Sequence, residues 1–233
     1  MHEKYTDILM KSLLFKSIKR GNLNHLLGCL NPIIRSYDKF DVVAVESRKL
    51  NGIGIVLEGA LNISKTSLTG NRILLGTAEP GELFGENAAY SEDCVWPANV
   101  ECQSEAVVMF IKPGSIVDQC SHACMWHGQL QKNMLGILSA RAIKLTKKIE
   151  YLAIKGLKAK IGTYLYNIYV RTGNREFNLP MKKYELAEFF NTARPSLSRE
   201  MINLREEGTI DFTGGRIKLL NIGRIEKIID GLE

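Results

Sequence analysis

The stretch that decides the fold is 182-KKYELAEFFNTARPSLSREMINLREEGTI-210. Leu186 and Phe190 give its first half an apolar helical side, and Ala187 is small where a second helix must cross closely. Asn191 lies in the tight turn that follows, where a left-handed residue is needed and asparagine is tolerated. The stretch therefore predicts a helix-turn-helix.

The second helix of this motif opens with an arginine-proline pair, and proline is accepted in a first helical turn, where its missing N–H would form no helical hydrogen bond. Leu197, Met201 and Leu204 follow one another at i, i+4 and i+7, which predicts a buried side. The residues near the helix start that face elsewhere are Arg194, Pro195, Ser198 and Arg199. In this motif such positions enter a major groove, where arginine can donate two hydrogen bonds to guanine.

A helix-turn-helix pattern alone is a weak signal, because an ordinary helical hairpin with surface arginines has the same pattern. Here the segments 209–212 and 216–220 flank Thr213-Gly214-Gly215 and predict a β-hairpin, which supplies a wing. The formal net charge of +6 also favours a polyanionic partner. Since these features agree, the C-terminal part is predicted to bind double-stranded DNA.

A long helix is predicted upstream of this motif, because apolar residues recur there at steps of three and four. The stripe consists of Leu130, Met134, Leu138, Ala142, Leu145, Ile149 and Leu152. It can be buried against the chain's own domains or against the same helix of a second copy. The length of the helix and its place between two domains favour a homodimer.

Residues 33–111 break into short apolar runs separated by glycines and polar turns, which predicts antiparallel strands in a sandwich or barrel. Short helical patterns in residues 7–30 predict a small helical cap. With 233 residues the chain is long enough for two domains. We expect a cytoplasmic protein, because there is neither a signal-peptide layout at the N-terminus nor a long apolar span. The chain shows no nucleophile–base, P-loop or paired-carboxylate pattern, so an enzyme is not expected.

The whole chain resembles the CRP/FNR family of bacterial transcription regulators. Three stretches carry the resemblance: GIGIVLEGALNISK, PGELFGE and TARPSLSREMINLREEGTI. It implies an α+β fold with an N-terminal, jelly-roll-like antiparallel β-roll, a long dimerisation helix and a C-terminal winged helix-turn-helix, over residues 1–114, 115–153 and 154–233. It also implies a homodimer on a palindromic DNA operator, a small-molecule effector and RNA polymerase as a candidate partner.

The resemblance assigns roles along the recognition helix. Arg199 falls on the base-reading arginine of the family, and Arg194 on an arginine of the cyclic-AMP receptor. Ser198 matches a serine of FNR-like members, and Ser196 matches a hydroxyl residue that touches phosphate. Pro195 stands where the two regulators that give the CRP/FNR family its name carry a base-reading glutamate. Because proline cannot accept a hydrogen bond from cytosine, the operator is expected to differ.

The candidate effector residues are Gly85 and Glu86, which match the start of the family's phosphate-binding cassette. In cyclic-nucleotide binders an Arg-Ser/Thr-Ala triplet follows, and its arginine neutralises the cyclic phosphate. Counted without a gap, this chain has Trp96-Pro97-Ala98 there. Since an unpaired phosphate is costly to bury, the effector is expected to be something other than cyclic AMP, with Glu86 structural. No cofactor is assigned.

Other sensing chemistries remain open alternatives. Cys120, Cys124 and His127 share one helical face at i, i+4 and i+7 and are weak candidates for zinc, haem or a redox thiol switch. The alternative is that the thiols simply pack as small apolar groups. An FNR-type iron–sulfur cluster is not expected, because no cysteine precedes Cys29. A regulatory module acting on a protein partner is a further alternative, but it would have no use for a winged recognition helix.

Overall fold

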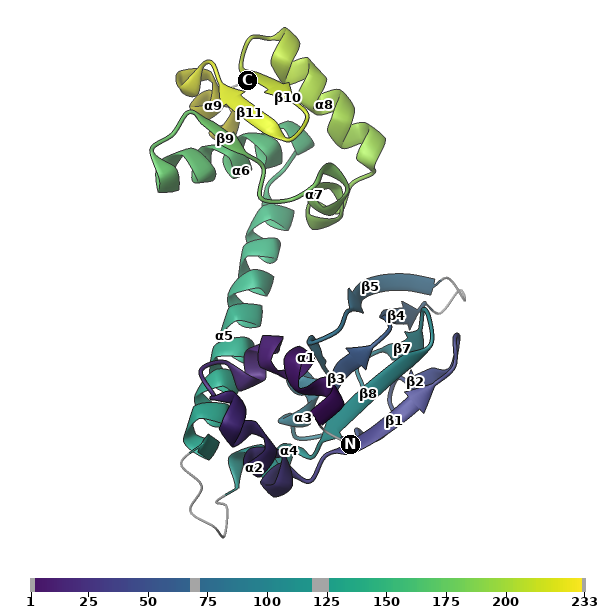
Figure 1. The fold of residues 1–233 in the computed structure, drawn as a ribbon. Coiled ribbons are helices and arrows are strands. Elements are labelled where there is room, and N and C mark those ends of the chain that lie inside the picture. Colours follow the sequence, from purple (N-terminus) through teal and green to yellow (C-terminus); the bar gives the residue numbers. More distant parts are fainter. Residues whose placement is uncertain (1–2, 68–71, 119–125, 232–233) are drawn as a thin grey trace. The chain divides into compact units, whose positions relative to one another are not determined.

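The computed structural model describes residues 3–67, 72–118 and 126–231 (Figure 1). The chain divides into two compact units, Met1–Arg141 and Ala142–Glu233. Helix α5 (Trp126–Ala153) continues from the first unit into the second. The division into residues 1–114, 115–153 and 154–233 stays a prediction.

The first unit opens with the predicted helical cap. It consists of η1 (Glu3–Tyr5), α1 (Thr6–Lys11), η2 (Leu13–Phe15) and α2 (Arg20–Leu30). Leu23, Leu26, Leu27 and Leu30 form the buried side of α2 at the expected helical spacing. Two shorter helices, α3 (Glu86–Ala89) and α4 (Pro113–Val117), lie between and after the strands.

Two four-stranded antiparallel sheets follow, as the short apolar runs predict (Figure 1). One has the order β1 (Ile33–Tyr37), β8 (Ala106–Ile111), β3 (Ile53–Glu58) and β6 (Leu83–Phe84). The other has the order β2 (Val42–Ala44), β7 (Asn99–Cys102), β4 (Leu61–Thr66) and β5 (Arg72–Ala78). The first five residues of β3 are buried, as expected for a strand covered on both faces.

The core of the first unit includes one side of α5. Leu130, Met134 and Ile137 are buried together with the leucines of the helical cap and the apolar residues of β3 and β8. This corrects the predicted stripe in its first half, because Leu130 and Met134 are covered by their own chain. The sequence period shows which residues share a helical side, but it does not show what covers that side.

The second unit is the predicted winged helix-turn-helix. Its elements are α6 (Leu157–Thr172), β9 (Glu176–Asn178), α7 (Lys183–Phe189), α8 (Arg194–Glu206), β10 (Ile210–Thr213), β11 (Arg216–Leu219) and α9 (Ile222–Ile229). Strands β10 and β11 form the expected hairpin, and β9 adds a third strand beside β11 that the sequence pattern did not predict. Tyr151, in the last turn of α5, is buried in this unit, and its hydroxyl accepts a hydrogen bond from Asn167 at 3.0 Å.

Candidate nucleic-acid interface

The turn between α7 and α8 has the predicted geometry. Asn191 adopts a φ of 53°, in the left-handed region. Its N–H donates to the carbonyl of Glu188 at 3.1 Å, and the next N–H, of Thr192, donates to Ala187 at 2.9 Å. The turn thereby closes the end of α7 and starts α8 in a fixed direction.

Helix α8 has a sharply divided surface. Leu197, Met201 and Leu204 are buried, as predicted. On the outer side Arg194, Pro195 and Arg199 are exposed, and Ser196 and Ser198 are half-buried. Neither Arg194 nor Arg199 forms an ion pair with any residue that the structure describes. Both guanidinium groups are therefore available to an external anion.

One further exposed residue on this outer side, Ile202, was not predicted from the sequence. Ile202 is 37% exposed and lies one turn beyond Ser198 and Arg199. An isoleucine in a helix suggests a buried position. Ile202 lies seven residues after Pro195, about two helical turns along the same side, and only this spacing shows that it does not share the buried side of α8.

The side chain of Phe212, in the wing, contacts residues of both helices of the motif. The ring of Phe212, in β10, has the Lys183 ammonium 4.4 Å from its centroid and the Arg205 guanidinium carbon 4.9 Å from it. Lys183 opens α7 and Arg205 lies in the last turn of α8. Such cation–π contacts are individually modest, but together they connect β10 with both helices of the motif.

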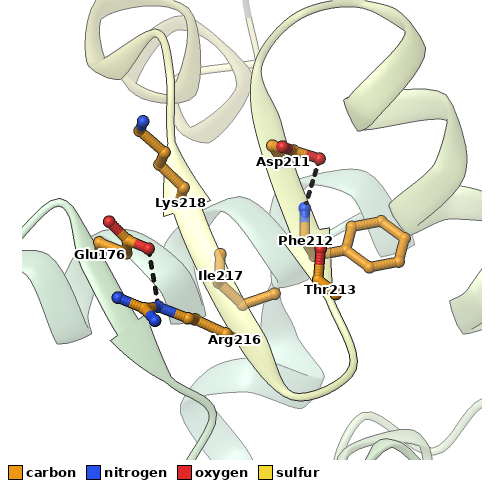
Figure 2. Close-up of a pocket in the computed structure, with 7 residues that line it drawn as sticks. All are labelled: Glu176, Asp211, Phe212, Thr213, Arg216, Ile217 and Lys218. Atoms are coloured by element: carbon orange, nitrogen blue, oxygen red, sulfur yellow. Dashed lines mark hydrogen bonds and ion pairs between the residues drawn. The ribbon is translucent and has the colours of Figure 1, made fainter.

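A small hollow in the wing is lined by residues of β9, β10 and β11 (Figure 2). Arg216 of β11 is ion-paired there with Glu176 of β9 at 2.7 Å, which ties the third strand to the hairpin. The hollow has a volume of about 80 Å³, against roughly 300–1,000 Å³ for ligand pockets in general. It is too small to hold a nucleotide.

A second face of α5 is apolar and, apart from the half-buried Leu138, exposed in the described part of the chain. Its residues recur at alternating steps of three and four: Leu135, Leu138, Ala142, Leu145, Ile149 and Leu152. Leu135 and Ile149 are each 66% exposed, and Leu138 is half-buried. This spacing is that of a coiled-coil seam. We call these six residues the α5 seam.

The cassette residues of the first unit, Gly85 and Glu86, are closely packed by neighbouring side chains. Gly85 has a φ of 81°, and a Cβ placed on it would lie 2.7 Å from the ring of Trp96. Trp96 is 4% exposed and stacks on Phe84, with ring centroids 5.8 Å apart. The indole thus packs against Gly85, and in an ungapped count along the sequence Trp96 takes the place of the phosphate-binding arginine.

Glu86 is fully buried and is ion-paired with Arg141 of α5. A second guanidinium nitrogen of Arg141 donates to the carbonyl of Leu83 at 2.9 Å. Burial raises the pKa of Glu86 above its usual value, outweighing the opposite effect of Arg141. This pairing is not predictable from the sequence, because 55 positions separate two residues that no local pattern connects.

Two other cations near the sheets already have partners. Lys65 is ion-paired with Glu46 at 3.1 Å. Arg72 is ion-paired with Glu101 at 3.1 Å and donates to the Ser64 hydroxyl at 2.9 Å. A phosphate group would have to displace these carboxylates to use either cation.

The alternative metal or redox site is only partly visible. Cys120 and Cys124 lie outside the described residues. His127 is buried, and its Nε2 donates to the carbonyl of Ser115 at 3.1 Å. Within residues 3–67, 72–118 and 126–231, no three potential metal-binding side chains gather.

A known protein-family model matches each of the two units. Residues 34–122 match the model of the cyclic nucleotide-binding domain, and residues 159–228 match the model of the Crp-like helix-turn-helix domain. The chain belongs to the CRP/FNR family of transcription regulators. As a member of that family it is a DNA-binding transcription regulator and not an enzyme.

Individual members of this CRP/FNR family are distant in sequence. The transcriptional regulator LdrP of Thermus thermophilus is 25% identical over 175 residues, which cover 73% of this chain and 83% of that protein. The transcriptional activator protein FnrA of Stutzerimonas stutzeri is 22% identical over 192 residues, covering 80% and 76%. The structure of the Thermus thermophilus catabolite activator protein superposes with a TM-score of 0.54 at 19% identity, over 95% of this chain and 100% of that one. This last likeness concerns the fold.

None of the helices in the described part of this CRP/FNR regulator combines the length and the apolar character needed to cross a membrane.

Proposed function

We propose that this CRP/FNR regulator binds a palindromic operator as a homodimer, with α8 of each copy in a major groove. The observation that carries the proposal is the outer side of α8, where Arg194 and Arg199 are exposed and have no carboxylate partner among the described residues. Arg199 would read guanine, and Ser196 would contact phosphate. Arg194, Pro195 and Ser198 would complete the interface.

Selection of binding sequences from random duplexes tests this proposal. A dimer with a two-fold axis is expected to select an inverted repeat, with half-site centres about 34 Å apart, one helical turn. Selection of a single, non-repeated site, or no enrichment at all, would contradict it.

The homodimer is proposed to form along the α5 seam. Leu135 and Ile149 are too exposed to be left in water on a helix of 28 residues, and the alternating spacing suits a second copy of the same helix. Leu145→Arg places a charge in this seam. We expect it to dissociate the dimer in sedimentation velocity and to weaken operator binding accordingly.

Ile143→Arg provides the matched control, because Ile143 is 57% exposed on the same helix but lies outside the seam. It is expected to leave the dimer intact. Equal dissociation by the two variants, or by neither, would overturn the proposed seam.

We further propose that DNA binding by this regulator is controlled by an effector other than a cyclic nucleotide. The support is the closed cassette: Trp96 fills it, and Glu86 is paired with Arg141 rather than open to a ribose hydroxyl. Calorimetry with cyclic AMP and cyclic GMP is expected to give no binding heat at sub-millimolar ligand. Micromolar binding of either would show that Lys65, Arg72 or Arg141 exchanges its partner for the phosphate.

A further inference from the structure

The outer side of α8 carries one stripe that combines apolar residues with the base-reading arginine. Pro195, Ser198, Arg199 and Ile202 stand at i, i+3, i+4 and i+7. Recognition helices read base edges from residues with this spacing. The stripe lies opposite the buried side formed by Leu197, Met201 and Leu204.

Two members of the stripe can form no hydrogen bond with a base. The side chains of Pro195 and Ile202 contain only carbon and hydrogen, and both are exposed, Ile202 by 37%. In the major groove the apolar group that base pairs present is the C5 methyl of thymine. A hydrocarbon side chain placed against any other base edge would remove water from a donor or acceptor without replacing its hydrogen bond.

We infer that Ile202 and Pro195 select thymine by contact with its methyl group, on the two sides of the base read by Arg199. The inference rests on the proposed role of α8 in the major groove. Each half-site then contains a guanine flanked by thymines, on either strand, at the positions that the two apolar side chains reach.

Replacement of thymine by deoxyuridine tests this directly, because it removes the methyl group and leaves every hydrogen-bonding atom in place. The operator is first selected with the full-length wild-type protein, and each thymine is then replaced singly. Fluorescence anisotropy is expected to show about a fourfold loss of affinity at a methyl-contacting position, the effect of losing the burial of roughly one methyl group.

Ile202→Ala identifies the side chain responsible. It is expected to bind the thymine and deoxyuridine operators equally at one position, whereas Ile202→Val keeps most of the preference. Val170→Ala removes an exposed apolar side chain from α6, on the same unit, and should retain the full wild-type preference. Pro195→Ala is expected to remove the preference at a different position.

The inference is overturned if wild-type protein tolerates deoxyuridine at every position, or if Ile202→Ala keeps the wild-type preference. Arg199→Ala separates this failure from that of the proposed function. If Arg199→Ala binds the selected operator as tightly as wild type, α8 is not the reading helix. If it loses specific binding while deoxyuridine has no effect, only the methyl contact is wrong.

Discussion

The cassette around Gly85 and the outer side of α8 use charge in opposite ways. In the cassette, Glu86 is fully buried and its compensating charge, Arg141, comes from the same chain. On α8, Arg199 is exposed, and the described part of the chain offers it no carboxylate. The buried carboxylate thus has its counter-charge within the chain, whereas the exposed guanidinium is solvated and free to bind an anion from outside. The two regions therefore differ in where a counter-charge can come from: from the same chain at Glu86, and from a bound partner at Arg199.

The largest effect that would sharpen this comparison is expected from Trp96→Ala. The indole is 4% exposed and stacks on Phe84, so its loss leaves a cavity and should lower the free energy of unfolding by about 3–5 kcal/mol. Urea denaturation measures the change. Trp126→Ala is the control, because Trp126 is only partly buried and should lose less. A loss below about 1 kcal/mol for Trp96→Ala would mean that the cassette is not held closed by the indole.

Arg141→Gln is expected to lower the free energy of unfolding by about 2–3 kcal/mol at neutral pH, because it leaves the buried Glu86 carboxylate without its partner. This is less than the roughly 3–5 kcal/mol usual for breaking a fully buried pair, since the Arg141 side chain is 39% exposed. Arg20→Gln makes the same change in an ion pair with Asp7 whose side chains are 66% and 73% exposed. Its effect should be below about 1 kcal/mol.

The loss in Arg141→Gln should also depend on pH. Burial already raises the pKa of Glu86 above the unfolded value of 4.5, and removal of Arg141 raises it further. A carboxyl whose pKa is higher in the folded state stabilises that state most at pH values below its unfolded-state pKa. This contribution is lost as the pH rises through the folded-state pKa. Denaturation should therefore show a larger deficit at pH 8 than at pH 5. An equal deficit at both would mean that Glu86 keeps the same charge throughout.

Arg199→Ala tests the open side of the comparison. Loss of two hydrogen bonds to guanine should weaken operator binding by about 1–3 kcal/mol per half-site, while weak, salt-sensitive binding to random duplex persists. Anisotropy with both duplexes measures the two affinities. If both fall equally, Arg199 contacts phosphate and the assignment to a base is wrong.

The smallest effect is expected from Ser196→Ala. A single hydroxyl contact to phosphate contributes about 0.5–1 kcal/mol and carries no sequence information. Operator and random duplex should therefore lose affinity alike in the same assay. A loss confined to the operator would make Ser196 a base-reading residue.

Local sequence patterns predicted most of the second unit. The buried side of α8, the left-handed Asn191 and the β10–β11 hairpin all follow from spacing and turn chemistry over a few residues. Strand β9 was not predicted, because its three residues are too few to establish an alternating strand pattern. Ile202 was missed because an isoleucine on a helix ordinarily indicates a buried position.

The first unit was predictable in outline but not in its decisive contacts. The strands follow from short apolar runs, yet the pairing of Glu86 with Arg141 depends on how the sheets and α5 come together. For the same reason Leu130 and the α5 seam could not be told apart. They lie on neighbouring sides of one helix, and only the folded chain shows which side it covers itself.

The position of the aromatic residues makes the two units optically distinct. The chain contains two tryptophans, Trp96 and Trp126, and both lie in the unit Met1–Arg141. Emission excited selectively in tryptophan therefore comes from this first unit alone, because residues 142–233 contain no tryptophan. In a Trp126→Phe background the remaining indole, Trp96, lies directly against Gly85, so its emission reports on any change in packing around that residue.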